Sequence, residues 1–346
     1  MPQIFVTGAT GFIGSHLVKR LSEQGDAVRC LIRNPAKADE LLALGRGIEL
    51  VPGSLQQPHL YREALQDCDV VYHLAGLTSS LRARELWKVN AEGTHRLLQA
   101  CAQNRQPPVV VSVSSLSAAG PWVERGGRRV GNTARPISNY GRSKLAGDLI
   151  AARLSERLPI SIVRPGIVFG ERNIETLPMF RSIYRTRMHA VPTFRPPRLS
   201  FIHQADLVDI LLRVARQGQR LSDHRGAPLR DRVVPTACGV YFAGDPRTVS
   251  YAELGLLIGQ AVGVSSPLMM HVPEPMLWVA STVNAYVSHL MGRLDAFNPD
   301  KIREAMAGDW IMEDSRLLEE LDFHFTRSLE DRFQETARWY LSQGWL

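Results

Sequence analysis

Three glycines spaced three residues apart near the start of the chain constrain its fold more than any other feature. They follow the apolar run 4–6 and precede residues 12–21, whose apolar positions recur with helical period, so a strand, a glycine turn and a helix are predicted. A turn without Cβ atoms lets backbone approach a pyrophosphate, which the free N–H groups and dipole of the helix attract. A plain strand-to-helix turn is the alternative, but the place of this turn in the first predicted βα unit favours a dinucleotide site. The residues assigned to that site are Gly8, Thr10, Gly11, Phe12, Ile13 and Gly14.

Strand-like and helix-like patterns alternate along the first half of the chain. Further strands are expected at 27–32, 48–51, within 69–76, and at 108–114 and 160–164. This alternation predicts an α/β fold, a Rossmann-type doubly wound parallel sheet with helices on both faces and ligands at the carboxyl ends of its strands.

The pattern becomes irregular from about residue 171. We therefore expect residues 1–170 to form the dinucleotide-binding domain and 171–346 a smaller α/β substrate lobe, with 200–243 returning to the first domain. A linker is expected at 218–238, and 317–346 should be mostly helical.

Composition excludes several classes of function. The net charge of +7 comes from arginines scattered along the chain without a basic block beside stacking aromatics, so no nucleic-acid partner is expected. The four cysteines are far apart and the histidines show no ligand spacing, so neither a disulfide framework nor a metal site is predicted. The chain enters a strand directly, without a charged and then apolar leader, which predicts a cytoplasmic protein.

Tyr140 and Lys144 lie four residues apart at a predicted helix start, and therefore share one helix face. With eight tyrosines and five lysines in 346 residues, chance should give such a pair about 0.1 times. A carbonyl or carbinol needs a proton donor or acceptor, and a tyrosine with its ordinary pKa of about 10 needs a nearby ammonium to act as a base at neutral pH. The alternative is a surface tyrosine stacked along a lysine stem.

These features resemble the extended short-chain dehydrogenase/reductase family over nearly the whole chain. The resemblance is carried by the glycine turn, His73-Leu-Ala-Gly76, Val89-Asn90-x-x-Gly-Thr94, Ser115 and the Tyr140-x-x-x-Lys144 pair. It implies that Tyr140 is the general acid/base, that Lys144 lowers its pKa and binds the nicotinamide ribose, and that Ser115 orients the reacting oxygen. Ser115 is preferred to its neighbours Ser114 and Ser117 because it lies twenty-five residues before Tyr140.

The resemblance also implies cofactor contacts from two further segments, in addition to Tyr140 and Lys144: Leu74, Ala75, Gly76, Pro165, Gly166 and Ile167. Asn90 is interpreted as a supporting residue, with helix capping or packing as the alternative. His73 and His203 are interpreted as structural histidines.

Two classes of enzyme fit this pattern. The first is an oxidoreductase that moves a hydride between NAD(P) and a secondary alcohol or ketone of a hydrophobic substrate of sterol, acyl or flavonoid type. The second is a nucleotide-sugar 4-epimerase or dehydratase that returns the hydride it removes. A non-catalytic dinucleotide sensor is a third reading, which the complete Ser115, Tyr140 and Lys144 set disfavours.

The hydrophobic class is preferred because the epimerases of the family carry an Asn where Ile167 stands, and a late Arg-Pro-Gly-Asp-like element whose nearest match here, 306–310, lacks the arginine. The run 164–171 looks more like that of 3β-hydroxysteroid dehydrogenases and dihydroflavonol reductases, and Met269, Met270, Leu277 and Trp278 are expected to line an apolar site. The arginines within 181–198 leave diphosphate binding open.

NADP is the expected cofactor, with NAD as the alternative. The second strand ends at Arg33, where NAD enzymes usually carry a carboxylate, and Arg33 with Lys37 could pair with a 2′-phosphate. An arginine stacked on adenine would tolerate either cofactor.

Residues 275–292 contain no Asp, Glu, Lys or Arg and predict an amphipathic helix over the substrate lobe, with core packing as the alternative. The expected partner is a small-molecule substrate, with at most a peripheral membrane contact, and a homodimer stays open.

Overall fold

The computed structural model describes residues 2–45, 47–122, 127–129, 131–192, 196–221, 238–291 and 298–346. Seven parallel strands form its main sheet, in the order β10-β6-β5-β4-β1-β2-β3. Their bounds are β1 Gln3–Thr7, β2 Ala27–Ile32, β3 Ile48–Pro52, β4 Val70–His73, β5 Val109–Val113, β6 Ile160–Pro165 and β10 Val240–Ala243. The predicted doubly wound parallel sheet is confirmed.

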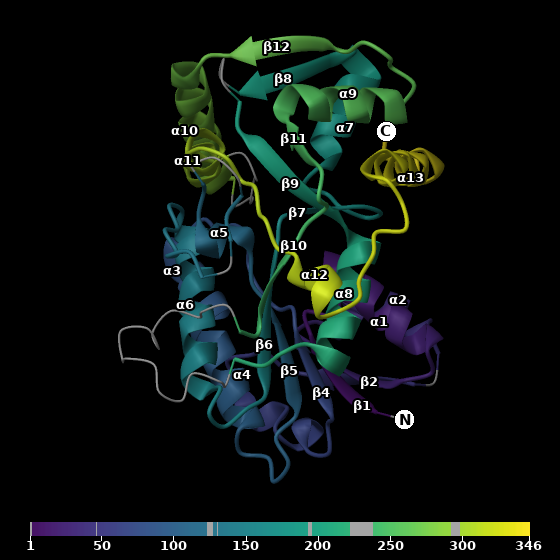
Figure 1. Cartoon of the computed structure of the whole chain (residues 1–346), viewed down its shortest axis with the longest axis vertical. Helices are drawn as coiled ribbons and strands as arrows, with labels where there is room; N and C mark the ends of the chain where they lie inside the picture. Colours follow the sequence, from purple (N-terminus) through teal and green to yellow (C-terminus); the bar gives the residue numbers. More distant parts are fainter. Residues whose placement is uncertain are drawn as a thin grey trace.

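Helices cover both faces of the main sheet (Figure 1). The helices and helical turns of this half are α1 Phe12–Glu23, η1 Pro35–Lys37, α2 Asp39–Leu42, η2 Pro58–Leu60, η3 Glu63–Leu65, α3 Ala83–Trp87, η4 Lys88–Gly93, α4 Thr94–Cys101, α5 Leu116–Ala119, α6 Asn139–Leu154, α8 Gln204–Gln217 and α12 Arg316–Glu319. The π-helical turn η4 carries Asn90, in the segment where the sequence pattern indicates an uninterrupted helix.

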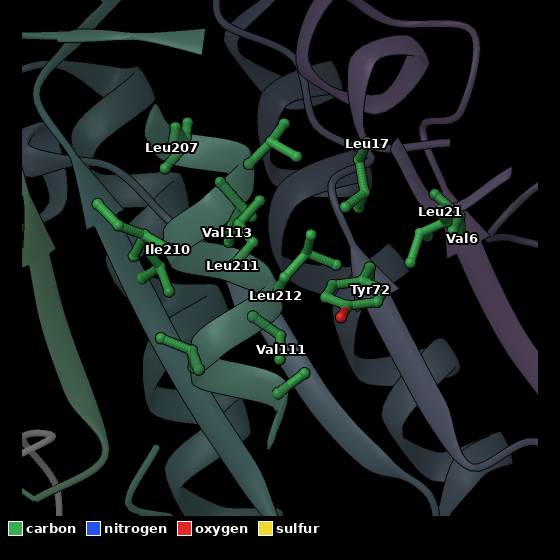
Figure 2. Packing of buried hydrophobic residues seen from close by; sticks show 14 of the residues in the cluster. Val6, Leu17, Leu21, Tyr72, Val111, Val113, Leu207, Ile210, Leu211 and Leu212 are labelled. Atoms are coloured by element: carbon green, nitrogen blue, oxygen red, sulfur yellow. The ribbon is translucent and has the colours of Figure 1, made fainter. Parts of the chain in front are cut away.

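Alternating side chains of the central strands enter two separate apolar clusters. Ile4 and Val6 of β1 pack with Leu17 of α1 and Leu211 of α8, whereas Phe5 between them packs with Leu97 of α4 on the other face. Figure 2 shows the first cluster, with α8 lying across Val111, Val113 and Tyr72. Burial on both faces explains why the strands read as continuous apolar runs.

The second lobe is built around two small sheets, β11-β9-β7 and β12-β8, at the carboxyl end of the main sheet (Figure 1). Its elements are β7 Ile167–Phe169, α7 Leu177–Thr186, β8 Met188–Pro192, β9 Arg198–His203, β11 Thr248–Ser250, α9 Tyr251–Ala261, β12 Leu268–Val272, α10 Glu274–Leu290, α11 Pro299–Met306 and α13 Leu329–Ser342. A third apolar cluster, with Phe169, Phe201 and Phe333 at its centre, joins these elements.

Two predicted segments differ in detail. The segment 317–346 is interrupted between α12 and α13, where Asp322 adopts a left-handed backbone and Arg213 binds the carbonyls of Leu321 and Asp322. Most of the predicted linker, 222–237, lies outside the described residues.

Candidate active site

The glycine turn between β1 and α1 is shaped by close backbone contacts. Gly8 has a left-handed φ of +74°, and a Cβ there would lie 2.7 Å from the backbone nitrogen of Ala75. A Cβ on Gly14 would lie 2.1 Å from the carbonyl oxygen of Gly8, which also accepts a hydrogen bond from Gly11 N at 2.9 Å. Both positions therefore require glycine, one for its backbone angle and both for the space they leave.

The start of α1 carries neither a side-chain cap nor an acidic residue in its first turn. Its first N–H groups and dipole can therefore receive an anion at the carboxyl edge of the sheet. Arg33, exposed directly after β2, follows the strand next to β1. These features fit the pyrophosphate and ribose ends of a dinucleotide.

The small-residue turn after β4 lies against Asn90 and Lys144. A Cβ on Gly76 would lie 3.2 Å from Asn90 Oδ1 and 3.6 Å from Lys144 Nζ. Asn90 holds this turn by accepting from Leu77 N at 2.8 Å and donating to Leu77 O and Ser143 Oγ at 2.9 Å. Asn90 thus joins the turn after β4 to the helix that carries Tyr140.

The three predicted catalytic side chains come from α5 and α6. Ser115 caps α5, its hydroxyl accepting from Ser117 N at 3.1 Å, and also makes a side-chain hydrogen bond to the half-buried Tyr140. Ser138 caps α6 by accepting from Gly141 N at 2.9 Å, which fixes Tyr140 in the first turn of the helix. A Cβ on Gly141 would lie 2.3 Å from the Ser117 carbonyl oxygen, so the glycine allows α6 to approach α5 closely.

Burial raises the pKa of Tyr140 to about 12, against the opposing effects of the Ser115 hydrogen bond and the Lys301 charge. The phenol is therefore protonated at neutral pH. A protonated tyrosine bonded to a serine hydroxyl can donate a proton to a carbonyl oxygen.

Lys144 lies on the face of α6 that turns toward β5. Its Nζ donates to the carbonyl oxygen of Val113 at 2.7 Å, and burial lowers its pKa to about 8 although Asp148 opposes the shift. Asp148 also forms a buried ion pair with Arg164 at 2.8 Å. Lys144 is thus held between the end of β5 and the turn after β4.

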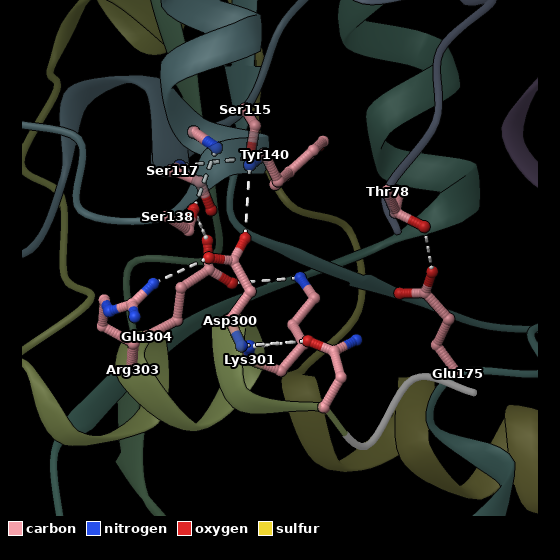
Figure 3. A network of polar contacts seen from close by, with 12 residues as sticks. Thr78, Ser115, Ser117, Ser138, Tyr140, Glu175, Asp300, Lys301, Arg303 and Glu304 are labelled. Carbon is pink, nitrogen blue, oxygen red and sulfur yellow. Dashed lines mark hydrogen bonds and ion pairs between the residues drawn. The ribbon is translucent and has the colours of Figure 1, made fainter. Parts of the chain in front are cut away.

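Helix α11 of the second lobe contacts the start of α6 with three charged side chains (Figure 3). Asp300 accepts from the backbone nitrogen of Asn139 at 2.9 Å, and Glu304 accepts from the Ser138 hydroxyl at 2.6 Å. The Lys301 ammonium lies 5.0 Å from the centroid of the Tyr140 ring and donates to Glu304 at 3.0 Å. Sequence reasoning missed these residues, because no local motif links them to Tyr140.

The segment after β6 positions the two lobes. Pro165 ends β6, and a Cβ on Gly166 would lie 2.4 Å from the carbonyl oxygen of Ser200 in β9. Ile167 begins β7, which pairs with β9. The close approach of the two lobes thus requires glycine at position 166, independently of any contact that Gly166 makes with a cofactor.

His73 and His203 are buried at the carboxyl ends of β4 and β9. His73 bonds Thr7 at 2.8 Å and Thr94 at 2.9 Å, and burial lowers its pKa to about 3. His203 accepts from Ala205 N at 3.3 Å as the cap of α8, and burial again lowers its pKa to about 3. Both therefore have structural partners, and the described residues contain no cluster of His, Cys, Asp and Glu able to hold a metal.

Helix α10 differs from a usual surface helix in exposing much of its apolar surface. Ser281 and Ser288 are buried, whereas Val279 and Val283 are exposed. The Ser281 hydroxyl donates to the Trp278 carbonyl oxygen of its own helix at 3.1 Å, which allows a serine to be buried here. The predicted helix is present, but Met270 of the expected apolar lining is exposed. No described helix is long and apolar enough to cross a membrane.

Comparisons with known proteins agree with this fold. Residues 4–225 match the model of the NAD dependent epimerase/dehydratase family. A ceramide reductase of Caulobacter vibrioides is 27% identical over 346 residues, covering 99% of this chain and 96% of the relative. The 4-hydroxy-2-methyl-3-oxo-4-farnesyl-3,4-dihydroquinoline-1-oxide ketoreductase of Stigmatella aurantiaca is 28% identical, covering 87% and 90%.

Solved structures extend the comparison of fold. A UDP-glucose 4-epimerase from Thermotoga maritima, determined with UDP-glucose, superposes with a TM-score of 0.75 at 18% identity, covering 99% of each chain. At this identity the similarity establishes a shared fold.

Proposed function

Because this chain belongs to the NAD-dependent epimerase/dehydratase family, we propose that it reduces the ketone of a hydrophobic, lipid-like substrate to a secondary alcohol with NADPH. The observation that carries the proposal is the protonated Tyr140 phenol, bonded to Ser115 at the carboxyl end of the parallel sheet and across from the glycine turn. The reductases among the relatives, which match nearly full length, support a net reduction.

Four residues of the chain would have distinct roles in this reaction. Bound NADPH would supply the hydride that the carbonyl carbon accepts. Tyr140 would give its proton to the carbonyl oxygen while Ser115 holds that oxygen by a hydrogen bond. Lys301, over the ring, would stabilise the phenolate that forms, and Lys144, at the turn after β4, would bind the nicotinamide ribose. The proton on Tyr140 is then replaced from solvent.

The hydrophobic class of substrate is supported by Ile167 in place of the diphosphate-binding Asn of the nucleotide-sugar enzymes, and by the names of the two relatives. An unmade charge-assisted hydrogen bond to a diphosphate would weaken binding by roughly tenfold to a hundredfold.

The test is to supply the purified protein with NADPH and, separately, a long-chain 3-keto lipid and a panel of UDP-sugars. We expect NADPH to be consumed when the ketone is supplied. With the UDP-sugars we expect NMR to detect no new sugar product. Efficient epimerisation of a UDP-sugar without net change in the cofactor would reject the proposal in favour of the epimerase.

The preference for NADPH rests on Arg33, which is exposed after β2 where a carboxylate would bind the ribose of NAD. We expect Arg33→Asp to weaken NADPH binding by about tenfold or more and to leave NADH binding unchanged or stronger. Arg62→Asp in the same half is the control. Equal dissociation constants for the two cofactors in the wild-type protein would contradict the assignment.

A further inference from the structure

The outward side of α10 is a continuous apolar stripe. Met276, Val279, Val283 and Tyr286 follow one another at spacings of three and four residues, and 57–66% of the surface of each is exposed. The positions that face inward include the buried Ser281 and Ser288. The inward side also holds the half-buried Leu277 and Trp278, so the helix has apolar residues on both sides. A helix that only covered a protein core would not leave the outer stripe in solvent.

The two-stranded sheet next to α10 has the same property. In its parallel register Leu268 pairs with Met188 and Met270 with Ala190, so these four side chains lie on one side of the sheet. Leu268 and Met270 are exposed, whereas the alternate residue Val191 is buried toward α9. Since β12 leads into α10 through residue 273, the two apolar sets adjoin (Figure 1). We call Leu268, Met270, Met276, Val279, Val283 and Tyr286 the apolar outer face.

The rim of this face is positively charged. Arg187 lies beside the first residue of the face, because its carbonyl oxygen accepts from Leu268 N at 2.7 Å, and both Arg185 and Arg187 are exposed. Residues 177–192 and 262–291 together contain three arginines and one carboxylate, that of Glu274. Pairing of two such faces about a twofold axis would bring six arginines together with only two carboxylates, whereas an anionic surface complements the excess positive charge.

We propose that the apolar outer face docks this protein on the surface of an anionic lipid bilayer, with α10 lying in the headgroup region and with Arg185 and Arg187, at the end of α7, contacting phosphates. Exposed contiguous apolar side chains rimmed by basic residues are the surface that an interfacial helix presents to lipid. The proposal deepens the proposed function, because a lipid-like ketone would reside in that bilayer.

The position of α10 relative to Tyr140 supports this link. Helix α10 packs against α11, and α11 contacts the start of α6 through Asp300, Lys301 and Glu304. One helix thus separates the docking face from the proposed proton donor.

The test is flotation of the full chain with phosphatidylcholine vesicles prepared with and without phosphatidylglycerol. The wild-type protein should float with the anionic vesicles. Val279→Asp/Val283→Asp should lower the bound fraction by about tenfold or more, because two charges enter the apolar stripe. Arg185→Glu/Arg187→Glu should lower binding to anionic vesicles by about fivefold or more for each arginine replaced.

The matched control is Leu42→Asp/Leu318→Asp, two leucines with 51% of their surface exposed, on α2 and α12 of the other half. This variant should float like the wild-type protein. A wild-type protein that stays in the soluble fraction, or a loss of binding that the control shares, would overturn the proposal. So would a wild-type dimer by light scattering that Val279→Asp/Val283→Asp converts to monomer, since a second copy would then cover the face.

Activity on a short, water-soluble ketone without vesicles separates the two proposals. We expect Val279→Asp/Val283→Asp to keep the wild-type rate in that assay while losing flotation. Flotation without any NADPH-dependent reduction would reject the proposed function and keep the docking surface. Reduction without flotation would reject the docking surface and keep the proposed function.

Discussion

The seven-stranded half and the substrate lobe each bring groups to Tyr140, but in different ways. In the first half the groups lie at strand ends and in glycine turns, which local sequence motifs mark although their contacts, such as that of Gly8 with Ala75, join distant parts of the chain. In the lobe they lie on α11, whose Asp300 and Lys301 contact residues about 160 positions earlier. The first half thus provides a site that local sequence encodes, and the lobe adds charge through long-range contacts alone.

If the two lobes meet at a proton donor, its removal should give the largest effect of any substitution. Tyr140→Phe should lower kcat by about 10²–10⁴-fold, the usual contribution of a general acid, because only the phenolic proton is lost. The dissociation constant for NADPH should stay unchanged. Tyr184→Phe, an exposed tyrosine of α7, serves as the control. A Tyr140→Phe enzyme that retained more than a few per cent of the rate would remove Tyr140 from the mechanism.

The first half should be sensitive to a single methyl group. Gly14→Ala should lower the free energy of unfolding by about 1–3 kcal/mol and weaken NADPH binding, because its Cβ would overlap the carbonyl oxygen of Gly8. Gly25→Ala is the control, because an alanine there meets no atom within 4 Å and is strained only by the φ of +81°. Urea unfolding and cofactor titration measure both variants. Equal NADPH affinities in the two variants would mean that the close contact at Gly14 has no role in cofactor binding.

The lobe should act through the pKa of Tyr140. The charge of Lys301 lowers that pKa, so Lys301→Met should raise it. In the pH profile of the alcohol oxidation rate, the rising limb should then move by about one unit to higher pH. The sign follows because oxidation needs the phenolate, which then forms only at higher pH. Arg303→Met, on the same helix and paired with Asp300, is the control. A pH profile that stays in place while the rate falls would make Lys301 a purely structural residue.

The same division decides how much the sequence could predict. The bounds of β2 agree with the strand predicted at 27–32, and β6 extends the strand predicted at 160–164 by one residue, because buried β-branched runs and the turns after them are local signals. The glycine turn and the Tyr140 helix start were predictable for the same reason. The charged residues of α11 were not, since their roles come from contacts that only the folded chain makes.

Helix α10 lies between these cases. Periodicity predicted the helix and its two faces, but which face is buried depends on the neighbouring elements. The serines can face inward because Ser281 bonds a carbonyl of its own helix. The cofactor preference, the catalytic roles and the domain boundaries stay predictions.

The central claim, net hydride transfer to a lipid-like ketone with a proton from Tyr140, is tested most directly with deuterium. The protein is incubated with NADPH deuterated at the transferable position and a long-chain 3-keto lipid, and the alcohol is analysed by mass spectrometry. We predict one deuterium on the new carbinol carbon for each cofactor oxidised, and deuterated alcohol formed about 10²–10⁴-fold more slowly by Tyr140→Phe. No deuterated alcohol from the wild-type protein, together with turnover of a UDP-sugar at constant cofactor, would contradict the claim.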